Sequence, residues 1–262
     1  MNYYDQHLHT FLSFDSTEQF ENYLAYEPEF FVATDHFDLK NPYSDFHDDI
    51  PNYQHLVKKH QQLQETTNTH LLKGIEIGVV PGQEQTILDY LQDHPYDLKL
   101  ISIHQNGTFD YMDDAVLKKD KFDVAKIYFD QMATVLDSFP DGHIVTHFDY
   151  GLRRFDFSQE ELAHHFETEL TAIFKKIVAR DLAMEINAKS FGPYKNAPLY
   201  EYAIPLYQSV GGKLFTLGSD AHVASDYRLD FAAMSSLLRS FGVTELAVFQ
   251  GKERFMADLP EV

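Results

Sequence analysis

The sequence predicts an α/β fold in which parallel strands alternate with helices and close into a (β/α) barrel. Short apolar runs typical of strands recur along the chain, with longer amphipathic stretches typical of helices between them. The glycine signatures of nucleotide-binding folds, G-x-G-x-x-G after the first strand and G-x-x-x-x-G-K-[ST], do not occur. A chain of 262 residues is long enough for one barrel, so we expect a single domain over 1–262.

The elements are expected in strict alternation. Strands are expected at 2–4, 30–34, 71–80, 98–103, 143–148, 182–187, 213–219 and 245–249. Helices are expected near 17–26, 53–66, 83–93, 122–138, 159–180, 197–210 and 228–241. Ser158 is expected to cap its helix, and Ser16 or Thr17 to cap the first one. Residues 38–52 read as a long polar loop and a candidate lid.

The composition limits the possible partners. With 21 Lys and Arg against 41 Asp and Glu, the chain has a net charge of −20, which disfavours nucleic acid and anionic membranes as partners. Cysteine is absent, so disulfides and thiolate ligands are excluded. No apolar run is long enough for a membrane span, and the first residues do not resemble a signal peptide. We therefore expect a cytoplasmic location.

Histidines and carboxylates recur where the apolar runs end. One such residue is more often a satisfied buried group than a ligand, and the pair in "DQHLHT" could equally be two surface histidines. In a parallel barrel, however, the carboxyl ends of all strands meet on one face. Seven consecutive runs end this way, which indicates one shared site. The residues are His7 and His9 with Asp15, Asp35 and His36, Glu76, His104, His147, Glu185 and Asn187, and Asp220 and His222.

Nine of these side chains are candidate metal ligands. They are too many for one tetrahedral ion with an open position, so two or three ions are expected, with Glu76 as a bridge. Nitrogen and oxygen donors without thiolate favour Zn, Fe or Mn. The expected ligands are His7, His9, Asp15, His36, Glu76, His104, His147, Asp220 and His222. The other histidines are expected to be structural or solvated: His47, His55, His60, His70, His94, His143, His164 and His165.

The motifs resemble those of a known superfamily. "DQHLHT", "ATDH", "GIE", "SIH", "VTH" and "GSDAH", in this order over residues 5–222, are similar to the polymerase-and-histidinol-phosphatase (PHP) superfamily. Within it, "LSFDS", "HFDYGLRRF" and "EINAKS" resemble the histidinol-phosphate phosphatase family. The resemblance implies a distorted (β/α)7 TIM-like barrel, with the metal site at the carboxyl ends of the strands and 245–249 as a peripheral strand. It also implies a trinuclear metal centre and hydrolysis of L-histidinol phosphate in histidine biosynthesis.

The resemblance also implies roles for individual residues. One ion would be held by His7, His9, Glu76 and Asp220, a second by Glu76, His104 and His147, and a third by Asp15, His36 and His222. Asp15 departs from members that have histidine there, which alters the charge and the metal preference. Asp220 is expected to orient the attacking hydroxide. Arg153 or Arg154 is expected to contact the phosphate, and Lys189 is a weaker candidate. The leaving group could be protonated by Asp220 or by a metal-activated water.

Two alternatives remain open at this point. The chain could have another activity of the superfamily, as a phosphodiesterase, an exonuclease or a general phosphatase. The net charge disfavours a polynucleotide, so we expect a small phosphomonoester as the substrate. The chain could also be a noncatalytic metal-binding module, although a degenerate relative would be expected to lose ligands first. The sequence does not determine the oligomeric state.

Overall fold

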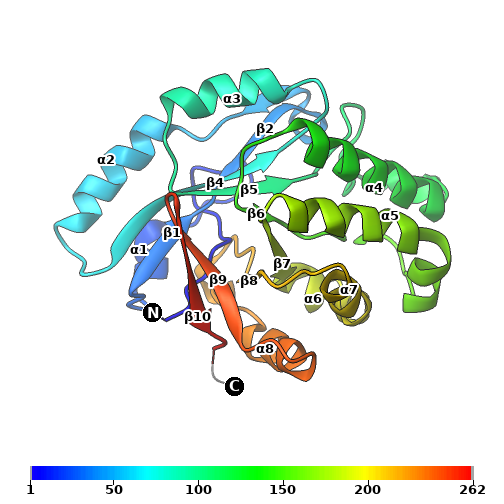
Figure 1. The fold of residues 1–262 in the computed structure, drawn as a ribbon. Coiled ribbons are helices and arrows are strands. Elements are labelled where there is room, and N and C mark those ends of the chain that lie inside the picture. The colour runs from blue at the N-terminus through cyan, green and yellow to red at the C-terminus, as the bar shows by residue number, and fades with distance from the viewer. Residues whose placement is uncertain (1, 261–262) are drawn as a thin grey trace.

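The structure, a computed structural model, describes residues 2–260 and alternates helices with strands (Figure 1). The helices are α1 (Phe20–Leu24), α2 (Tyr53–Gln64), α3 (Glu84–Asp93), α4 (Lys121–Ser138), α5 (Gln159–Ala179), α6 (Ala188–Phe191), α7 (Ala197–Ser209) and α8 (Phe231–Ser240). Short 3₁₀ turns are η1 (Pro42–Ser44), η2 (Asp114–Lys118), η3 (Tyr150–Leu152) and η4 (Ala224–Asp226). None of the helices in this part of the chain is long and apolar enough to cross a membrane.

The strands form one large sheet that is mostly parallel, and a separate hairpin. They are β1 (Phe30–Ala33), β2 (His36–Asn41), β3 (His47–Asp49), β4 (His70–Gly78), β5 (Leu98–Ser102), β6 (Ile144–Val145), β7 (Ala183–Asn187), β8 (Phe215–Gly218), β9 (Glu245–Gln250) and β10 (Glu253–Asp258). The large sheet has the order β3-β2-β4-β5-β6-β7-β8, with β1 also paired to β4. The pairs are parallel except β2–β3, while β9 and β10 form the antiparallel hairpin.

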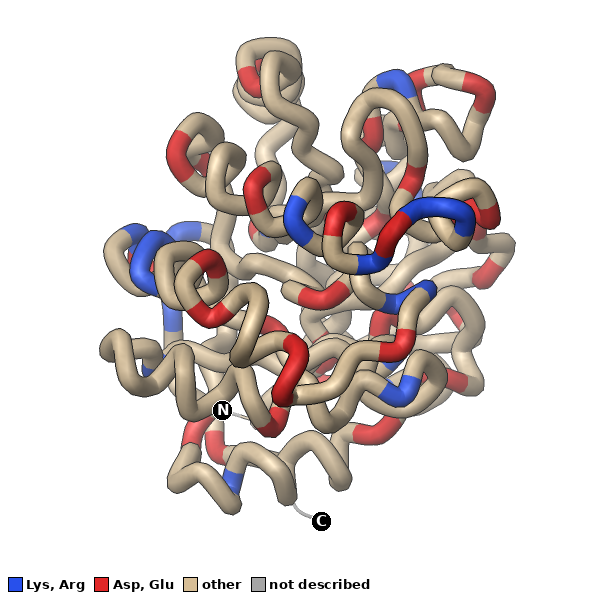
Figure 2. Tube along the Cα trace, turned by 90° about the vertical axis from the view of Figure 1, so that its right-hand side faces the viewer, with Lys and Arg blue, Asp and Glu red and all other residues tan. Residues whose placement is uncertain are grey.

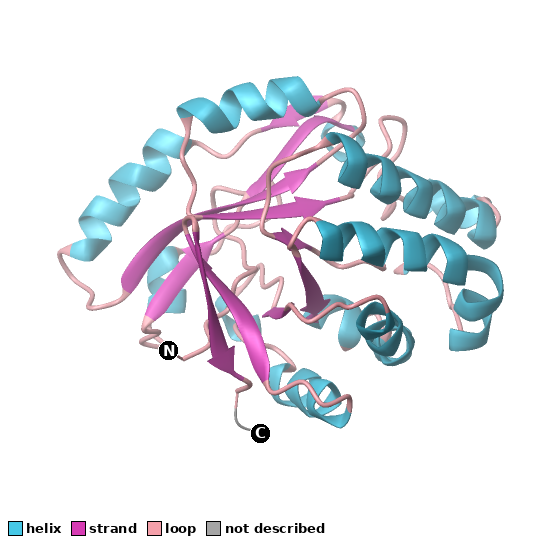
Figure 3. Cartoon of the chain, viewed as in Figure 1, coloured by secondary structure: helices cyan, strands magenta, loops and turns pink. Residues whose placement is uncertain are grey.

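The strands lie inside and the long helices lie outside them (Figure 3). Every residue of β7 and β8 is buried, as expected for parallel strands covered on both faces. The helices bury one side only: α5 places Leu162, Phe166 and Leu170 against the core. The predicted α/β class with a mostly parallel central sheet is therefore confirmed.

The expected helices agree with the observed ones to within a few residues. Ser158 forms the predicted capping box, because its hydroxyl accepts from the Glu161 backbone N–H and the Glu161 carboxylate accepts from that of Ser158. The predicted cap of the first helix is wrong. The N-cap of α1 is Gln19, and the Ser16 hydroxyl instead donates to the carbonyl of His222, 2.9 Å away. Ser16 thus ties the first loop to the loop after β8.

The first predicted strand, 2–4, is not a strand in the structure. Instead, residues 7–9 connect the segment after β1 to the segment after β8. The Thr34 N–H donates to the Leu8 carbonyl at 2.8 Å, and the His9 N–H donates to the Ala221 carbonyl at 2.8 Å. A ladder does not run around the whole ring, because the Leu8–Ala221 pairing is an isolated bridge. These hydrogen bonds hold His7 and His9 between the first and last parallel strands.

The stretch 38–52 is more ordered than the sequence predicts. It contains most of β2, the turn η1 and β3, which form an antiparallel hairpin in which Asn41 pairs with His47. The expected strand 30–34 continues as β2 after a break at Thr34 and Asp35, and both parts pair with β4. Asp35 lies at the break because its carboxylate accepts from the N–H of Thr10 at 2.6 Å. The break brings His36 into register with Glu76.

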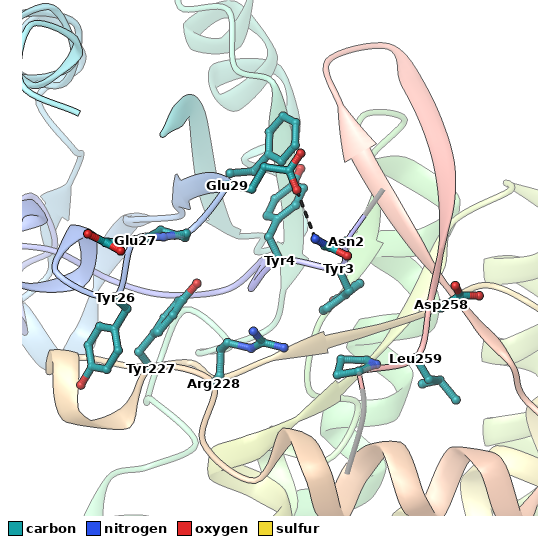
Figure 4. A pocket seen from close by; sticks show the side chains of 13 residues that line it. Asn2, Tyr3, Tyr4, Tyr26, Glu27, Glu29, Tyr227, Arg228, Asp258 and Leu259 are labelled. Atoms are coloured by element: carbon teal, nitrogen blue, oxygen red, sulfur yellow. Dashed lines mark hydrogen bonds between the residues drawn. The ribbon is translucent and has the colours of Figure 1, made fainter. Parts of the chain in front are cut away.

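A cavity of about 460 Å³ lies at the amino end of β1, beside the end of the β9–β10 hairpin (Figure 4). Tyrosines form much of its wall, and its charged rim includes Glu27, Arg228 and Asp258. None of the clustered histidines lines it. This cavity is therefore separate from the candidate metal site.

Candidate metal centre

Glu76 lies at the centre of the cluster of predicted ligands. It is buried near the carboxyl end of β4, and each of its two oxygens faces a different group of imidazoles. Oε1 lies 3.1 Å from Nε2 of His104 and 3.0 Å from Nε2 of His147. Oε2 lies 3.0 Å from Nδ1 of His36, 3.3 Å from Nε2 of His7 and 3.5 Å from that of His9. A carboxylate with different neighbours at each oxygen has the geometry of a bridging ligand.

Asp220 lies beside this centre, just after the end of β8. Its Oδ1 is 3.5 Å from Nε2 of His9 and 3.5 Å from Nζ of Lys189, and its Oδ2 is 3.2 Å from Nη2 of Arg153. The backbone of Asp220 has a φ of 54°, in the left-handed region that few non-glycine residues adopt. Its N–H donates to the His7 carbonyl at 2.8 Å, which holds this conformation in place. Such strain is often found at functional sites.

Asp15 closes the cluster on its outer side. Its Oδ2 lies 3.0 Å from Nε2 of His222 and 3.5 Å from Nε2 of His36, and its side chain is 30% exposed. The His9 ring packs between these two imidazoles, with centroid distances of 4.2 Å to each. All nine predicted ligands are therefore brought into one cluster.

Four combinations of these residues place their donor atoms within 4.8 Å of one another. They are His9–His36–His222, His7–His9–Glu76, His7–His147–Asp220 and His36–Glu76–His104. These groups overlap with the predicted three-way division but do not reproduce it, since His147 groups with His7 and His104 groups with His36. The cluster is thus continuous, with shared donors, rather than three separate sets.

Two carboxylates behind the cluster were not among the nine expected ligands. Glu185 in β7 accepts from Nδ1 of His7 at 2.6 Å, and Asp38 in β2 lies 3.1 Å from Nδ1 of His104. Each of these contacts fixes an imidazole by one nitrogen and turns the other toward Glu76. The sequence analysis placed Glu185 at a strand end but assigned it no role. Asp38 gave no signal, since the sequence places it in a loop.

Two glycines make room for these carboxylates. Gly78 ends β4 and Gly218 ends β8. A Cβ on Gly78 would collide with the carboxylate of Asp38, and one on Gly218 would collide with that of Glu185. A side chain at either position would displace the group that orients a clustered histidine. The glycines therefore belong to the architecture of the site.

The donor atoms at the centre lack hydrogen-bond partners among the described residues. They are Nε2 of His7, Nε2 of His9, Nδ1 of His36 and Oε2 of Glu76, and all four are buried. Buried polar atoms without partners are costly, and here all four converge on one point. A cation with nitrogen and oxygen ligands satisfies them together. The residues present thus fit a metal centre of Zn, Fe or Mn type.

The electrostatics of Glu76 and His9 also suit metal binding. Burial would raise the pKa of the Glu76 carboxyl, but His7 and His104 hold it well below its usual range. Burial lowers the pKa of His9, and the neighbouring His222 lowers it further, well below its usual value. Glu76 is therefore ionised and His9 neutral. These are the forms that donate electron pairs to a metal.

A cavity of about 250 Å³ opens onto the cluster. Arg153 lies in its wall, between the rings of Tyr150 and Tyr194 at 4.9 and 5.2 Å from their centroids. Its Nε donates to the Ser190 hydroxyl and its Nη2 to the side-chain oxygen Oδ1 of Asn187, each at 2.8 Å. Nη1 makes no hydrogen bond within the described chain. Arg153 is thus held rigidly with one donor group free.

The other two predicted substrate contacts differ in their placement. Lys189 lines the same cavity and its Nζ donates to Nδ1 of His222 at 2.6 Å. Arg154 points elsewhere: it bonds the carbonyl of Met112 and lies 2.7 Å from Asp114, and it does not line the cavity. Arg154 is therefore not placed to contact the substrate. Consecutive residues of the tight turn after η3 project in different directions, so at most one of the two arginines could face the site.

Comparison with known proteins identifies the relatives of this chain. No family model matches it. A histidinol-phosphatase from Lactococcus lactis subsp. lactis (strain IL1403) is 26% identical over 254 residues, which cover 94% of each chain. The chain is a homologue of the histidinol-phosphatases. This confirms the resemblance predicted from the sequence motifs.

Two further matches agree with this homology. A Clostridium acetobutylicum protein named "Probable histidinol-phosphatase" is 28% identical over 240 residues, covering 87% of this chain and 89% of that protein. The crystal structure of histidinol phosphate phosphatase from Lactococcus lactis, complexed with zinc, L-histidinol and phosphate, superposes with a TM-score of 0.84 at 24% identity. The superposition covers 96% of the present chain and 98% of the Lactococcus lactis protein, which establishes the shared fold.

Proposed function

We propose that this protein is a metal-dependent phosphomonoesterase that hydrolyses L-histidinol phosphate to L-histidinol and phosphate in histidine biosynthesis. The observation that carries the proposal is Glu76, whose two oxygens lie within 3.5 Å of five imidazoles beneath a small cavity. The homology to histidinol-phosphatases over 94% of the chain supports the substrate. We also propose a cytoplasmic location.

We further propose that the fold is a single distorted (β/α)7 barrel over 1–262, of which residues 2–260 are described. The hydrogen bonds of Leu8 and His9 support this, because they link the segment after β1 to the segment after β8 beside the proposed ligands. The β9–β10 hairpin lies outside the ring as a peripheral addition. Most of the proposed ligands then lie at or near the carboxyl end of a parallel element, as in other barrels of this type, while His36 begins β2 and Asp15 lies in the loop before α1.

We assign two to three divalent transition-metal ions, Zn, Fe or Mn, to the nine clustered residues. Bound divalent ions lower the pKa of a coordinated water and polarise phosphoryl oxygens. Asp220 is assigned as the catalytic residue that orients the attacking hydroxide and holds its proton at Oδ1, which faces His9. Arg153 offers its free Nη1 to a phosphate oxygen, while Nη2 stays bound to Asn187. Lys189 adds a second positive charge on the same side.

The expected substrate is a small phosphomonoester, and neither nucleic acid nor a membrane is an expected partner. In Figure 2, Lys and Arg form short, separated stretches among Asp and Glu, with no continuous basic band. The net charge of −20 adds general repulsion against a polyanion. A small dianion is still attracted locally by bound ions together with Arg153 and Lys189.

A phosphate-release panel tests the proposed function. We expect kcat/KM for L-histidinol phosphate to exceed that for p-nitrophenyl phosphate, and activity on bis(p-nitrophenyl) phosphate to be much lower. Both monoester activities should disappear with a chelator and return with Zn²⁺ or Mn²⁺. Equal rates on the two monoesters would reject the specific substrate. Preferred cleavage of the diester would favour a phosphodiesterase, and inactivity of metal-replete protein would favour a binding module.

The metal content of the purified protein is expected to be two to three transition-metal ions per chain. His9→Ala and His222→Ala should each lower this content, because each removes a proposed ligand from the cluster. His164→Ala, a histidine on the surface of α5, provides the control and should keep full occupancy. Elemental analysis after metal-replete expression measures it. One ion per chain or fewer would contradict the assignment.

A further inference from the structure

Asp110 is a carboxylate of the cavity wall that the proposed metal centre does not use. Four carboxylates line the cavity, and Asp15, Glu76 and Asp220 belong to the metal cluster. Asp110 is 5% exposed and lies in the loop after β5, outside every group of potential ligands. The chemistry of the proposed reaction leaves it without a function.

The loop holds Asp110 firmly in place. Asp110 pairs with Gln105 in an antiparallel bridge, and the next residue, Tyr111, donates its N–H to the His104 carbonyl at 2.9 Å. The Tyr111 ring is fully buried. The carboxylate is thus presented to the cavity by a rigid turn anchored directly to His104.

The hydrogen bonds of Asp110 leave one oxygen available. Oδ1 accepts from the Met112 N–H at 2.7 Å and lies 3.4 Å from the Tyr150 hydroxyl. Oδ2 makes no hydrogen bond within residues 2–260. No Lys or Arg in that range forms an ion pair with Asp110, and Arg153, which also lines the cavity, is paired with Asp220.

A buried carboxylate without a cationic partner is energetically unfavourable. Burial raises the pKa of Asp110 to about 6. The Met112 N–H and the nearby His104 lower this pKa in part, while the negative charges of Asp38 and Asp113 add to the increase. The group is still mainly ionised at neutral pH. A cation bound in the cavity would supply the missing partner.

We propose that Asp110 binds the ammonium group of the substrate through Oδ2 and thereby selects aminoalkyl phosphates. This inference rests on the proposed function. Arg153 and Lys189 line the cavity and supply positive charge for the phosphate. Asp110 lines the same cavity and supplies negative charge for the ammonium group. Of the two basic groups of histidinol, the ammonium is the one that stays charged at neutral pH, since an imidazole titrates near 6.5. Asp110 is therefore a specificity-determining residue.

The test compares two substrates that differ by the amino group alone: L-histidinol phosphate and its des-amino analogue, in which hydrogen replaces that group. Their leaving groups are otherwise the same. For Asp110→Asn we expect kcat/KM for L-histidinol phosphate to fall roughly tenfold, mainly through KM, because a charge-assisted contact is lost. Turnover of the des-amino analogue should stay at the wild-type value. Asp114→Asn, an exposed carboxylate of the same loop, is the control and should change neither rate.

Other outcomes overturn the inference. An equal fall with both substrates would make Asp110 a proton donor or a structural residue, and loss of metal content would indicate a role in holding His104. An unchanged preference for L-histidinol phosphate would exclude the ammonium contact. If Asp110→Asn does not fold, Asp110→Ser gives the same comparison. Wild-type protein inactive on L-histidinol phosphate would instead reject the proposed function itself, which separates the two failures.

Discussion

Asp220→Asn is expected to lower kcat for L-histidinol phosphate by roughly 10²- to 10⁴-fold, the range for loss of a positioned general base. The physical reason is that an amide cannot take up the proton that Asp220 is proposed to hold. Burial would raise the pKa of Asp220, but Lys189 and His7 keep it well below its usual range. Asp220 is thus ionised, and free to accept a proton, throughout the neutral range.

The Asp220 variant is also expected to lose metal, because Oδ1 lies within 3.5 Å of Nε2 of His9. Steady-state kinetics and elemental analysis on the same sample separate the two effects. Excess metal should restore occupancy more than it restores kcat. Asp130→Asn, an exposed residue of α4 paired with Lys126, controls for loss of one negative charge. A metal-replete Asp220→Asn enzyme with wild-type kcat would refute the assigned role.

Arg153→Ala is expected to lower kcat/KM by roughly 10- to 150-fold, from loss of a charge-assisted contact worth roughly 1.5–3 kcal/mol. Inhibition by inorganic phosphate should weaken in parallel, because the same guanidinium would hold the product. Metal content should stay unchanged, since Arg153 contacts the cluster only through Oδ2 of Asp220. Added guanidinium ion should restore part of the activity by filling the space between Tyr150 and Tyr194.

Arg154→Ala is the matched control for this prediction. The two arginines are adjacent in sequence, yet Arg154 bonds Met112 and Asp114 outside the cavity. The variant should therefore keep the wild-type kcat/KM and the wild-type phosphate inhibition. If Arg154→Ala shows the loss and Arg153→Ala does not, the phosphate contact has been assigned to the wrong residue.

The sequence predicted the order of the parallel elements because buried parallel strands read as short apolar runs. It also indicated which residues meet, since the carboxyl ends of such strands share one face. His7, His104 and His147 were found this way. The signal was weaker where the chain departs from regular strands. Asp38 was read as part of a loop because the β2–β3 hairpin has a polar sequence.

The expected first strand shows the limit of this reasoning. "NYY" is apolar, but the hydrogen bonds that matter are made further along, at Leu8 and His9. Their partners, Thr34 and Ala221, are far apart in the sequence, and no local pattern specifies such a pairing. The tertiary structure therefore decides how the two ends of the sheet meet.

The sequence by itself determined the α/β class and the set of histidines and carboxylates at the strand ends, because residue type and period are local properties. The tertiary structure alone decided that Arg153 rather than Arg154 faces the cavity, and that Glu185 supports His7. It also separated Asp110 from the carboxylates of the metal cluster. Side-chain direction depends on turns and on contacts between distant segments, and neither can be read from spacing along the chain.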